Sequence, residues 1–262
     1  MSGVRPRKRF GQNFLHDPAI IQRIIDCIDP RPDEFIVEIG PGLGALTQPL
    51  LRGAGRLTAI EIDRDLPEAL QSACRGLGEL TVINADALRA DFTTLSAGAP
   101  MRLVGNLPYN ISSPLLFHLL GHARAIKDMH FMLQQEVVDR MVASPGSRDY
   151  GRLTVALAVR ARTQRLFTVG PGAFTPPPKV WSAVVRLQPL EEVPEPRVLD
   201  QLDRLLIQAF SQRRKTLRNS LGKLVGLDDL ATCGIDGQAR PETLSPSAFL
   251  SLARLLATRT TD

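Results

Sequence analysis

The stretch FIVEIGPGLG at residues 35–44 joins a short apolar run to a glycine-rich turn. Residues 35–39 predict a buried strand, and the three glycines that follow predict a tight turn before a helix starting near Ala45. Glycines let the backbone approach a ligand closely, and the first turn of a helix offers free N–H groups. This strand, turn and helix therefore predict a nucleotide-type cofactor site.

The turn does not decide which cofactor binds there. Gly40, Gly42 and Ala45 satisfy the dinucleotide fingerprint, but the same arrangement also serves S-adenosylmethionine. Glu61 lies in a second predicted strand, residues 57–63, about 20 residues past the turn, where a carboxylate would accept hydrogen bonds from ribose hydroxyls. Nicotinamide, flavin and S-adenosylmethionine cofactors all use such an acid, so these alternatives stay open on this evidence.

The alternation of strand and helix continues along the chain. Further strands are predicted at residues 80–87, 102–105 and 128–133, and a last one at 180–187 is expected to lie antiparallel to its neighbour. This rhythm predicts an α/β fold with a Rossmann-like, mostly parallel sheet and a site along its carboxyl edge. Asp86 closes the third strand, where a carboxylate suits an adenine amino group.

The fourth predicted strand runs into a polar loop, Asn106-Leu107-Pro108-Tyr109. An amide, a fixed turn and a phenol together form a set that can grip a planar base carrying an amino group. The prolines at 176–178 form a stiff segment that would hold Phe174 rigidly. We expect Tyr109 and Phe174 to sandwich the base; the alternative for Phe174 is a place in the core.

Positive charge is clustered near both ends of the chain. One cluster precedes FGQNFL at residues 10–15, and the other lies on predicted helices beyond a linker at residues 189–196. Such runs are either solvated surface or phosphate-binding surface. We expect two domains, 1–190 with the cofactor site and 191–262, small and α-helical, whose basic face is a candidate surface for RNA or the ribosome. The candidate RNA-binding residues are Arg5, Arg7, Lys8, Arg9, Arg213, Arg214, Lys215 and Arg218.

Composition limits the remaining classes of protein. The 262 residues are 44% hydrophobic and 23% charged, as in soluble globular proteins, and the net charge of +5 suggests a polyanionic partner. No apolar run approaches the roughly 20 residues of a membrane span, and the basic N-terminus lacks the apolar segment of a secretory signal. Three separated cysteines suggest reduced thiols in the cytoplasm. His118 and His122 lack a third ligand, so no metal site is expected.

Six motifs occur in a fixed order along the chain: FGQNFL, EIGPGLGALT, EID, NADAL, NLPYNISSP and FTPPPKVWS. In this order and at these intervals they resemble the ribosomal RNA adenine dimethyltransferases, and the basic segment SQRRKTLRNSL extends the match over nearly the whole chain. NLPY combined with FTPPPKVWS removes the dehydrogenase alternative. Within the family, the motifs most resemble bacterial enzymes that dimethylate two adjacent adenosines near the 3′ end of small-subunit (16S) ribosomal RNA.

This resemblance implies S-adenosylmethionine-dependent N6,N6-dimethylation, carried out on a late assembly intermediate of the small ribosomal subunit by a cytoplasmic protein that we expect to be a monomer. It places Glu61 at the cofactor ribose and Asp86 at the cofactor adenine. The target amine would face Asn106 and the Leu107 carbonyl, with Pro108 fixing the turn. The implied cofactor-binding residues are Asn13, Leu15, Gly40, Glu61, Asp86 and Asn106.

Three alternatives remain at this stage. One is a methyltransferase that modifies a single large-subunit adenine, which shares the core motifs. Another is a ribosome-assembly checkpoint in which binding matters more than methylation. The third, DNA adenine methylation, is disfavoured because Asn106 stands where those enzymes usually carry an acidic or Ser-containing loop.

Overall fold

The computed structural model describes residues 12–109, 111–212 and 215–259. By their contacts, the residues form two units, one running up to Val138 and including Gln164–Pro189, the other containing Asp139–Thr163 and the chain from Leu190 onward. Residues 139–163 thus group with the C-terminal unit instead of with residues 12–138. The division of roles between residues 1–190 and 191–262 stays a prediction.

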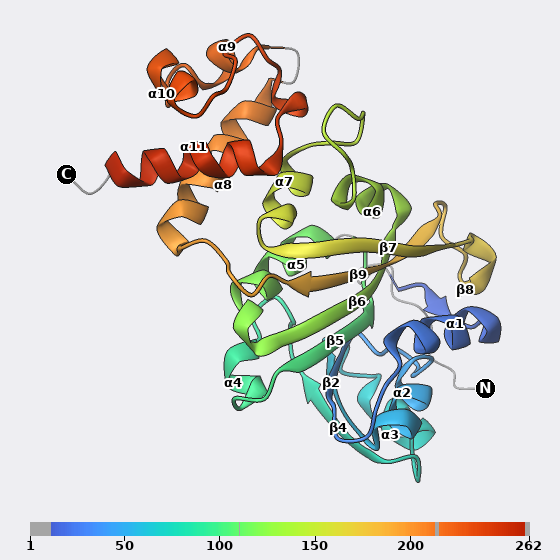
Figure 1. The fold of residues 1–262 in the computed structure, drawn as a ribbon. Coiled ribbons are helices and arrows are strands. Elements are labelled where there is room, and N and C mark those ends of the chain that lie inside the picture. Colours follow the sequence, from blue (N-terminus) through green and yellow to red (C-terminus); the bar gives the residue numbers. More distant parts are fainter. Residues whose placement is uncertain (1–11, 110, 213–214, 260–262) are drawn as a thin grey trace. The chain divides into compact units, whose positions relative to one another are not determined.

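A seven-stranded sheet, in the order β4-β3-β2-β5-β6-β9-β7, forms the framework of the first unit (Figure 1). Strands β2 to β6 pair in parallel, and β9 pairs antiparallel with β6. This confirms the predicted α/β, Rossmann-like sheet with an antiparallel strand. The strands are β2 (Phe35–Ile39), β3 (Arg56–Glu61), β4 (Glu79–Asn84), β5 (Met101–Asn106), β6 (Ile126–Gln134), β7 (Ala161–Val169) and β9 (Ser182–Pro189).

The helices of this unit follow the local sequence signals. For example, Asp17 caps the first helix, accepting hydrogen bonds from the backbone N–H groups of Ala19 and Ile20, and Pro18 occupies its first position. The apolar stripe that includes Ile24 and Ile28 then turns into the core. The helices are α1 (Pro18–Ile28), α2 (Thr47–Ala54), α3 (Pro67–Ala73), α4 (Phe92–Ser96) and α5 (Ser112–Gly121).

A second, two-stranded sheet is not evident from the sequence. Strand β1 (Phe14–Leu15) pairs antiparallel with β8 (Phe174–Thr175), so that Leu15 lies opposite Phe174. The N–H of His16 extends the ladder by donating to the carbonyl of Ala173 at 2.9 Å. This pairing ties residues 12–15, which we call the strap, to the proline-rich segment far along the chain, and Figure 1 shows β8 close to α1.

Buried charges fix the amino ends of the central strands, opposite the edge where the polar loops lie. Arg102 in β5 donates to both carboxylate oxygens of Asp128 in β6, at 2.9 and 3.1 Å, and to Glu34 at 2.8 Å. Asp128 is 1% exposed, so its charge depends on these partners. The network therefore holds the start of β5 in place against β6.

The second unit has a helical core of its own. Leu202, Leu205 and Leu206 of α8 are fully buried, as are Phe249 and Leu252 of α11. A small helical C-terminal domain is thus present, as predicted. The helices here are α7 (Arg152–Ala158), α8 (Pro196–Ser211), α9 (Leu217–Leu221), α10 (Leu227–Thr232) and α11 (Pro246–Arg259), and α6 (Gln135–Met141) crosses the division between the units.

The described residues bear on two further expectations. None of the helices they form is both long and apolar enough to cross a membrane. No three of their His, Cys, Asp or Glu side chains group as metal ligands would. The ring nitrogens of His118 and His122 instead bond the Ala90 carbonyl at 2.9 Å and the Thr93 hydroxyl at 2.8 Å.

Candidate active site

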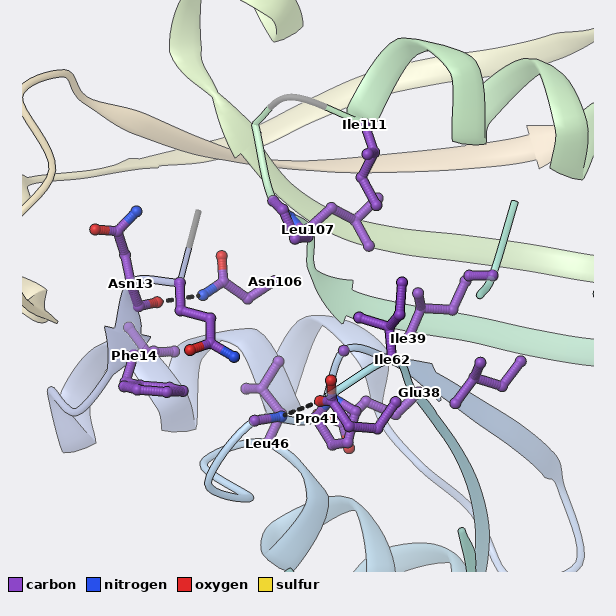
Figure 2. A pocket seen from close by; sticks show the side chains of 18 of the residues that line it. Asn13, Phe14, Glu38, Ile39, Pro41, Leu46, Ile62, Asn106, Leu107 and Ile111 are labelled. Atoms are coloured by element: carbon purple, nitrogen blue, oxygen red, sulfur yellow. Dashed lines mark hydrogen bonds between the residues drawn. The ribbon is translucent and has the colours of Figure 1, made fainter. Parts of the chain in front are cut away.

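A cavity of about 300 Å³ opens at the carboxyl ends of β2, β3, β4 and β5 (Figure 2). Its walls come from the glycine turn after β2, the acids after β3 and β4, the polar loop after β5, and the strap. All six residues predicted to bind the cofactor line it. They are Asn13, Leu15, Gly40, Glu61, Asp86 and Asn106.

The glycine turn is shaped by positive φ angles and by a close neighbour. Gly40 and Gly42 have φ values of 68° and 56°, which side-chain-bearing residues rarely adopt. A Cβ atom on Gly42 would lie 3.1 Å from the ring of Phe14. Glycine at this position therefore lets the strap pack directly against the turn and close one side of the cavity.

Glu61 is held in one orientation by backbone groups. Its carboxylate accepts hydrogen bonds from the N–H of Asp63 at 2.8 Å and the N–H of Gly42 at 3.3 Å. The side chain is 4% exposed, and this burial raises the pKa of Glu61 above its ordinary value, against the lowering effect of both hydrogen bonds. A buried, oriented acceptor at this place fits the ribose hydroxyls of a nucleoside cofactor.

The strap reaches both sides of the cavity. Figure 2 shows the side-chain amide of Asn106 donating from Nδ2 to the backbone carbonyl of Asn13, a distance of 3.0 Å. On the other side, Nε2 of Gln12 donates to the carboxylate of Asp63 at 3.2 Å. Since Nδ2 of Asn106 is committed to Asn13, the Oδ1 atom of the same amide is left as the acceptor.

The loop after β5 is fixed at several points. The N–H of Leu107 donates to the carbonyl of Met132 at 3.1 Å, and the hydroxyl of Ser112 donates to the carbonyl of Pro108 at 3.1 Å. The phenol of Tyr109 lies 2.8 Å from the hydroxyl of Ser182, and partial burial raises the pKa of this phenol. Asn106, Leu107, Pro108 and Tyr109 all line the cavity, so four of the five predicted catalytic residues meet there.

Phe174, the fifth, lies elsewhere. Its side chain is 2% exposed and packs in the core cluster that contains Leu15, Ile24 and Phe167, and it is not among the residues that line the cavity. Pairing of β8 with β1 turns this ring inward, because it draws the segment against the apolar face of α1. Phe174 is therefore not placed in the cavity wall beside Tyr109, and its stacking on a base stays a prediction.

The predicted RNA-binding residues are only partly described. Lys215 and Arg218 are exposed in the second unit, as phosphate-binding side chains must be. The other six, Arg5, Arg7, Lys8, Arg9, Arg213 and Arg214, lie outside the described residues. All eight assignments stay predictions.

The charge of the lining identifies the kind of cofactor that fits. Three carboxylates, from Glu38, Glu61 and Asp86, face or border the cavity, and none of its described lining residues is Lys, Arg or His. A pyrophosphate-bearing dinucleotide would meet no positive side chain among these residues, whereas a ligand with a sulfonium and an ammonium group finds compensating charge from Glu61 and Asp86. One oxygen of Glu38, Oε2, is buried without a hydrogen-bond partner among the described residues, as expected where a ligand supplies it. The fold and the site define an S-adenosylmethionine-dependent methyltransferase.

Comparison with known proteins then identifies the family. The model of the ribosomal RNA adenine dimethylase family matches residues 3–258, and the chain belongs to that family. It is a methyltransferase whose methyl donor is S-adenosylmethionine and whose substrate is ribosomal RNA. Ribosomal RNA small subunit methyltransferase A of Laribacter hongkongensis is 55% identical over 97% of this chain and 97% of its own length. Its namesake from Idiomarina loihiensis is 55% identical, over 96% of this chain and 88% of that protein.

Solved structures show the same architecture. A dimethyladenosine transferase from Plasmodium falciparum superposes with a TM-score of 0.78 at 29% identity, over 91% of this chain and 95% of that one. The 23S rRNA methyltransferase ErmE superposes with a TM-score of 0.72 at 30% identity, over 93% of this chain and 99% of that one. Both likenesses span the sheet and the helical C-terminal part.

Several lining residues were missed by sequence reasoning. Gln12 and Phe14 belong to a motif that the sequence analysis quoted, but only the β1·β8 pairing places them at the cavity. Glu38 lies two residues before Gly40, and an acid inside an otherwise apolar strand was a usable signal. Ile62 also lines the cavity although it is 47% exposed. In the sequence, its position between Glu61 and Asp63 was the one signal that pointed to it.

Glu38 makes the stability of the protein depend on pH. Burial raises the pKa of its carboxyl from 4.5 to about 7, so between these values the folded protein keeps a proton that the unfolded chain releases. The free energy of unfolding therefore falls as pH rises through this window. We expect Glu38→Gln to raise the free energy of unfolding relative to the wild type. This gain should be larger at about pH 8 than at about pH 5, by on the order of 2 kcal/mol, when both proteins are unfolded with denaturant.

A second buried group acts in the opposite direction. Burial lowers the pKa of His130 from 6.5 to about 4, so this residue makes stability rise with pH over that range. Only the difference between the variant and the wild type isolates Glu38. The matched control is Glu79→Gln, at an exposed glutamate that begins β4. The prediction would be contradicted if the free energies of unfolding of Glu38→Gln and the wild type differed by the same amount at every pH.

Proposed function

We propose that the protein transfers two methyl groups to N6 of each of two adjacent adenosines in the 3′-terminal hairpin of small-subunit ribosomal RNA. The substrate is an immature small ribosomal subunit in the cytoplasm, and the protein acts as a monomer. Support for the small subunit comes from relatives at 55% identity that carry the name ribosomal RNA small subunit methyltransferase A. The observation that carries the chemistry is the fixed amide of Asn106.

The target amine is a poor nucleophile because its lone pair is conjugated into the adenine ring. Oδ1 of Asn106 and the carbonyl of Leu107 are two acceptors in one loop, suited to the two N–H groups of that amine. Accepting both favours a pyramidal nitrogen whose lone pair is free to attack, which stabilises the transition state more than the ground state. When bound, S-adenosylmethionine supplies an electrophilic methyl group to this lone pair.

The other cavity residues position the two reactants. Glu61 would hold the cofactor ribose, Asp86 its adenine amine, and Asn13, Leu15 and Gly40 the rest of the cofactor. Pro108 keeps the Leu107 carbonyl aimed, and the ring of Tyr109 stacks on the target base. Because the described lining contains no histidine or lysine, the proton released by the methylated amine passes to water. Positioning, and not general-base catalysis, then supplies most of the acceleration.

The second methylation has a distinct requirement. A monomethylated amine has only one N–H group, so either Asn106 or Leu107 loses its partner in the second round. The cavity must also accept one additional methyl group beside the loop. A dimethyl product therefore requires space beside Asn106 that a strictly single-methyl enzyme could fill.

A second candidate is methylation of large-subunit RNA. It is favoured by the superposition on ErmE, a 23S rRNA methyltransferase that is 30% identical to this chain. The higher identity to small-subunit enzymes favours our first proposal. An assembly-checkpoint role is compatible with either reaction.

One assay separates these candidates. The purified protein is given labelled S-adenosylmethionine with immature small subunits, with naked large-subunit RNA, or with duplex DNA, and the methylated base is mapped. We expect label on two adjacent adenosines in the small-subunit arm only. Label confined to a single large-subunit adenine would overturn the proposed substrate, and a catalytically inactive variant that still restores subunit assembly would give the checkpoint role the greater weight.

A further inference from the structure

An exposed tryptophan stands next to the loop that carries the candidate active site. Trp181 is 55% exposed and its neighbour Val180 is 43% exposed. The following residue, Ser182, is completely buried, and its hydroxyl lies 2.8 Å from the phenol of Tyr109. Tyr109 lines the cavity, so Trp181 directly precedes a residue, Ser182, that contacts the cavity wall.

The backbone around Trp181 is held in place although the side chain is exposed. Its carbonyl accepts a hydrogen bond from the N–H of Gln135 at 2.9 Å, at the end of β6. The indole ring lies against Gly170, where a Cβ atom would be 3.7 Å from the ring. One part of the ring therefore rests on a glycine while more than half of the side chain faces solvent. Such a ring is already positioned for a flat ligand, so little conformational entropy remains to be lost on binding.

The chemistry of the surrounding segment favours RNA as the ligand. Between Gly170 and Ser182 the chain carries one charged residue, Lys179, which is exposed and positive, and no acid. An exposed aromatic face beside a positive charge is the combination that proteins use for unpaired bases and their phosphates. A protein partner would be expected to meet a broader apolar surface than two side chains provide.

We propose that Trp181 stacks on an unpaired base next to the target adenine and that Lys179 contacts the adjoining phosphate. This proposal rests on the proposed function, because it takes RNA methylation at the Asn106 loop as given. It adds a binding site outside the catalytic cavity, formed by Val180 and Trp181. Its role is to hold the flanking nucleotide while the target adenine is turned out of its stack.

The chain offers a direct probe, since Trp181 is its only tryptophan. Intrinsic tryptophan fluorescence is followed while the protein, loaded with S-adenosylhomocysteine to prevent turnover, is titrated with unmethylated RNA hairpin containing the two adjacent adenosines. We expect quenching that saturates together with RNA binding measured by an independent mobility-shift assay. A fully paired RNA duplex of the same length should bind without comparable quenching.

Variants test the same contact through affinity. We expect Trp181→Ala to weaken binding of the hairpin by about 5- to 30-fold, because stacking on an aromatic ring contributes roughly 1–3 kcal/mol per base and the site is partly solvated. Trp181→Phe should retain most of the affinity. Lys179→Ala should reduce the slope of log affinity against log salt concentration by about 1, the change expected when one phosphate contact is lost. Affinity for S-adenosylmethionine should stay unchanged in all three variants, and Val193→Ala, another partly exposed apolar side chain, is the matched control.

The outcomes separate this proposal from the proposed function. If the wild type methylates the hairpin but neither fluorescence nor Trp181→Ala responds, the stacking contact is wrong and the proposed function stands. If fluorescence responds to whole subunits but not to protein-free small-subunit RNA, a ribosomal protein is the partner and the proposal is overturned. If no small-subunit RNA is methylated at all, the proposed function itself fails.

Discussion

Asn106→Ala is expected to lower the rate of methyl transfer by about 10²–10³-fold while RNA and S-adenosylmethionine still bind. The substitution removes Oδ1, one of the two acceptors that favour the pyramidal amine in the transition state. It also removes the 3.0 Å hydrogen bond from Nδ2 to the Asn13 carbonyl, so the strap loses one of its attachments. Single-turnover transfer of labelled methyl, measured with both substrates saturating, reports the chemical step, and separate titrations report the two affinities.

Two further variants sharpen this test. Asn106→Asp keeps an acceptor but replaces the donor to Asn13 by a repelling carboxylate, so we expect impaired transfer together with weakened cofactor binding. Asn84→Ala is the matched control: Asn84 ends β4 at the edge of the same sheet and donates to the Glu61 carbonyl, but does not line the cavity. Near-normal turnover by Asn106→Ala would refute the role of this amide.

Phe174→Ala is expected to reduce the free energy of unfolding by about 3–5 kcal/mol, the usual effect of truncating a buried aromatic ring. The ring is 2% exposed, belongs to the core cluster, and lies opposite Leu15 in the β1·β8 pair. Because the strap residues Asn13 and Phe14 line the cavity, loosening this pair should also weaken S-adenosylmethionine binding. Chemical denaturation and cofactor titration of the folded protein measure the two effects.

This expectation differs from the one that follows from the sequence alone, in which Phe174 stacks on the base and its loss spares the cofactor. Phe92→Ala provides the comparison, since Phe92 is also fully buried in the same unit but packs between His118 and His122. It should destabilise the protein similarly without changing cofactor affinity. If instead Phe174→Ala leaves stability and cofactor affinity intact and loses transfer alone, the stacking role is correct.

The order of the main elements was predictable because each rests on a local pattern. Apolar runs ending in Gly40, Glu61 and Asp86 define parallel strands, and parallel strands bring their carboxyl ends to one edge of a sheet. For this reason Glu61 and Asp86 could be predicted as cofactor-binding acids without coordinates, whereas Asn13 and Leu15 followed only from the resemblance to the family. Helix α1 was equally accessible, since Asp17 and Pro18 mark its start and the isoleucines repeat with a helical period.

The contacts that assemble the active site were less accessible. The bond from Asn106 to Asn13 joins residues 93 positions apart, and that from Tyr109 to Ser182 joins residues 73 apart. No periodicity encodes such pairs, and strands of two residues, as in β1 and β8, are too short to leave an alternating pattern. The burial of Phe174 depends on that pairing, which is why its two sequence-level interpretations could not be separated.

The sequence by itself determined the class of fold and the family, because strand-end chemistry and motif spacing are local properties of the chain. The tertiary structure decided which atoms are free to act. It commits Nδ2 of Asn106 to the strap, leaves Oδ1 as the acceptor, and places Phe174 in the core. It also leaves Trp181 in solvent beside the loop. These outcomes depend on which distant segments pack together, a competition for burial and hydrogen bonds that is settled only when the whole chain folds.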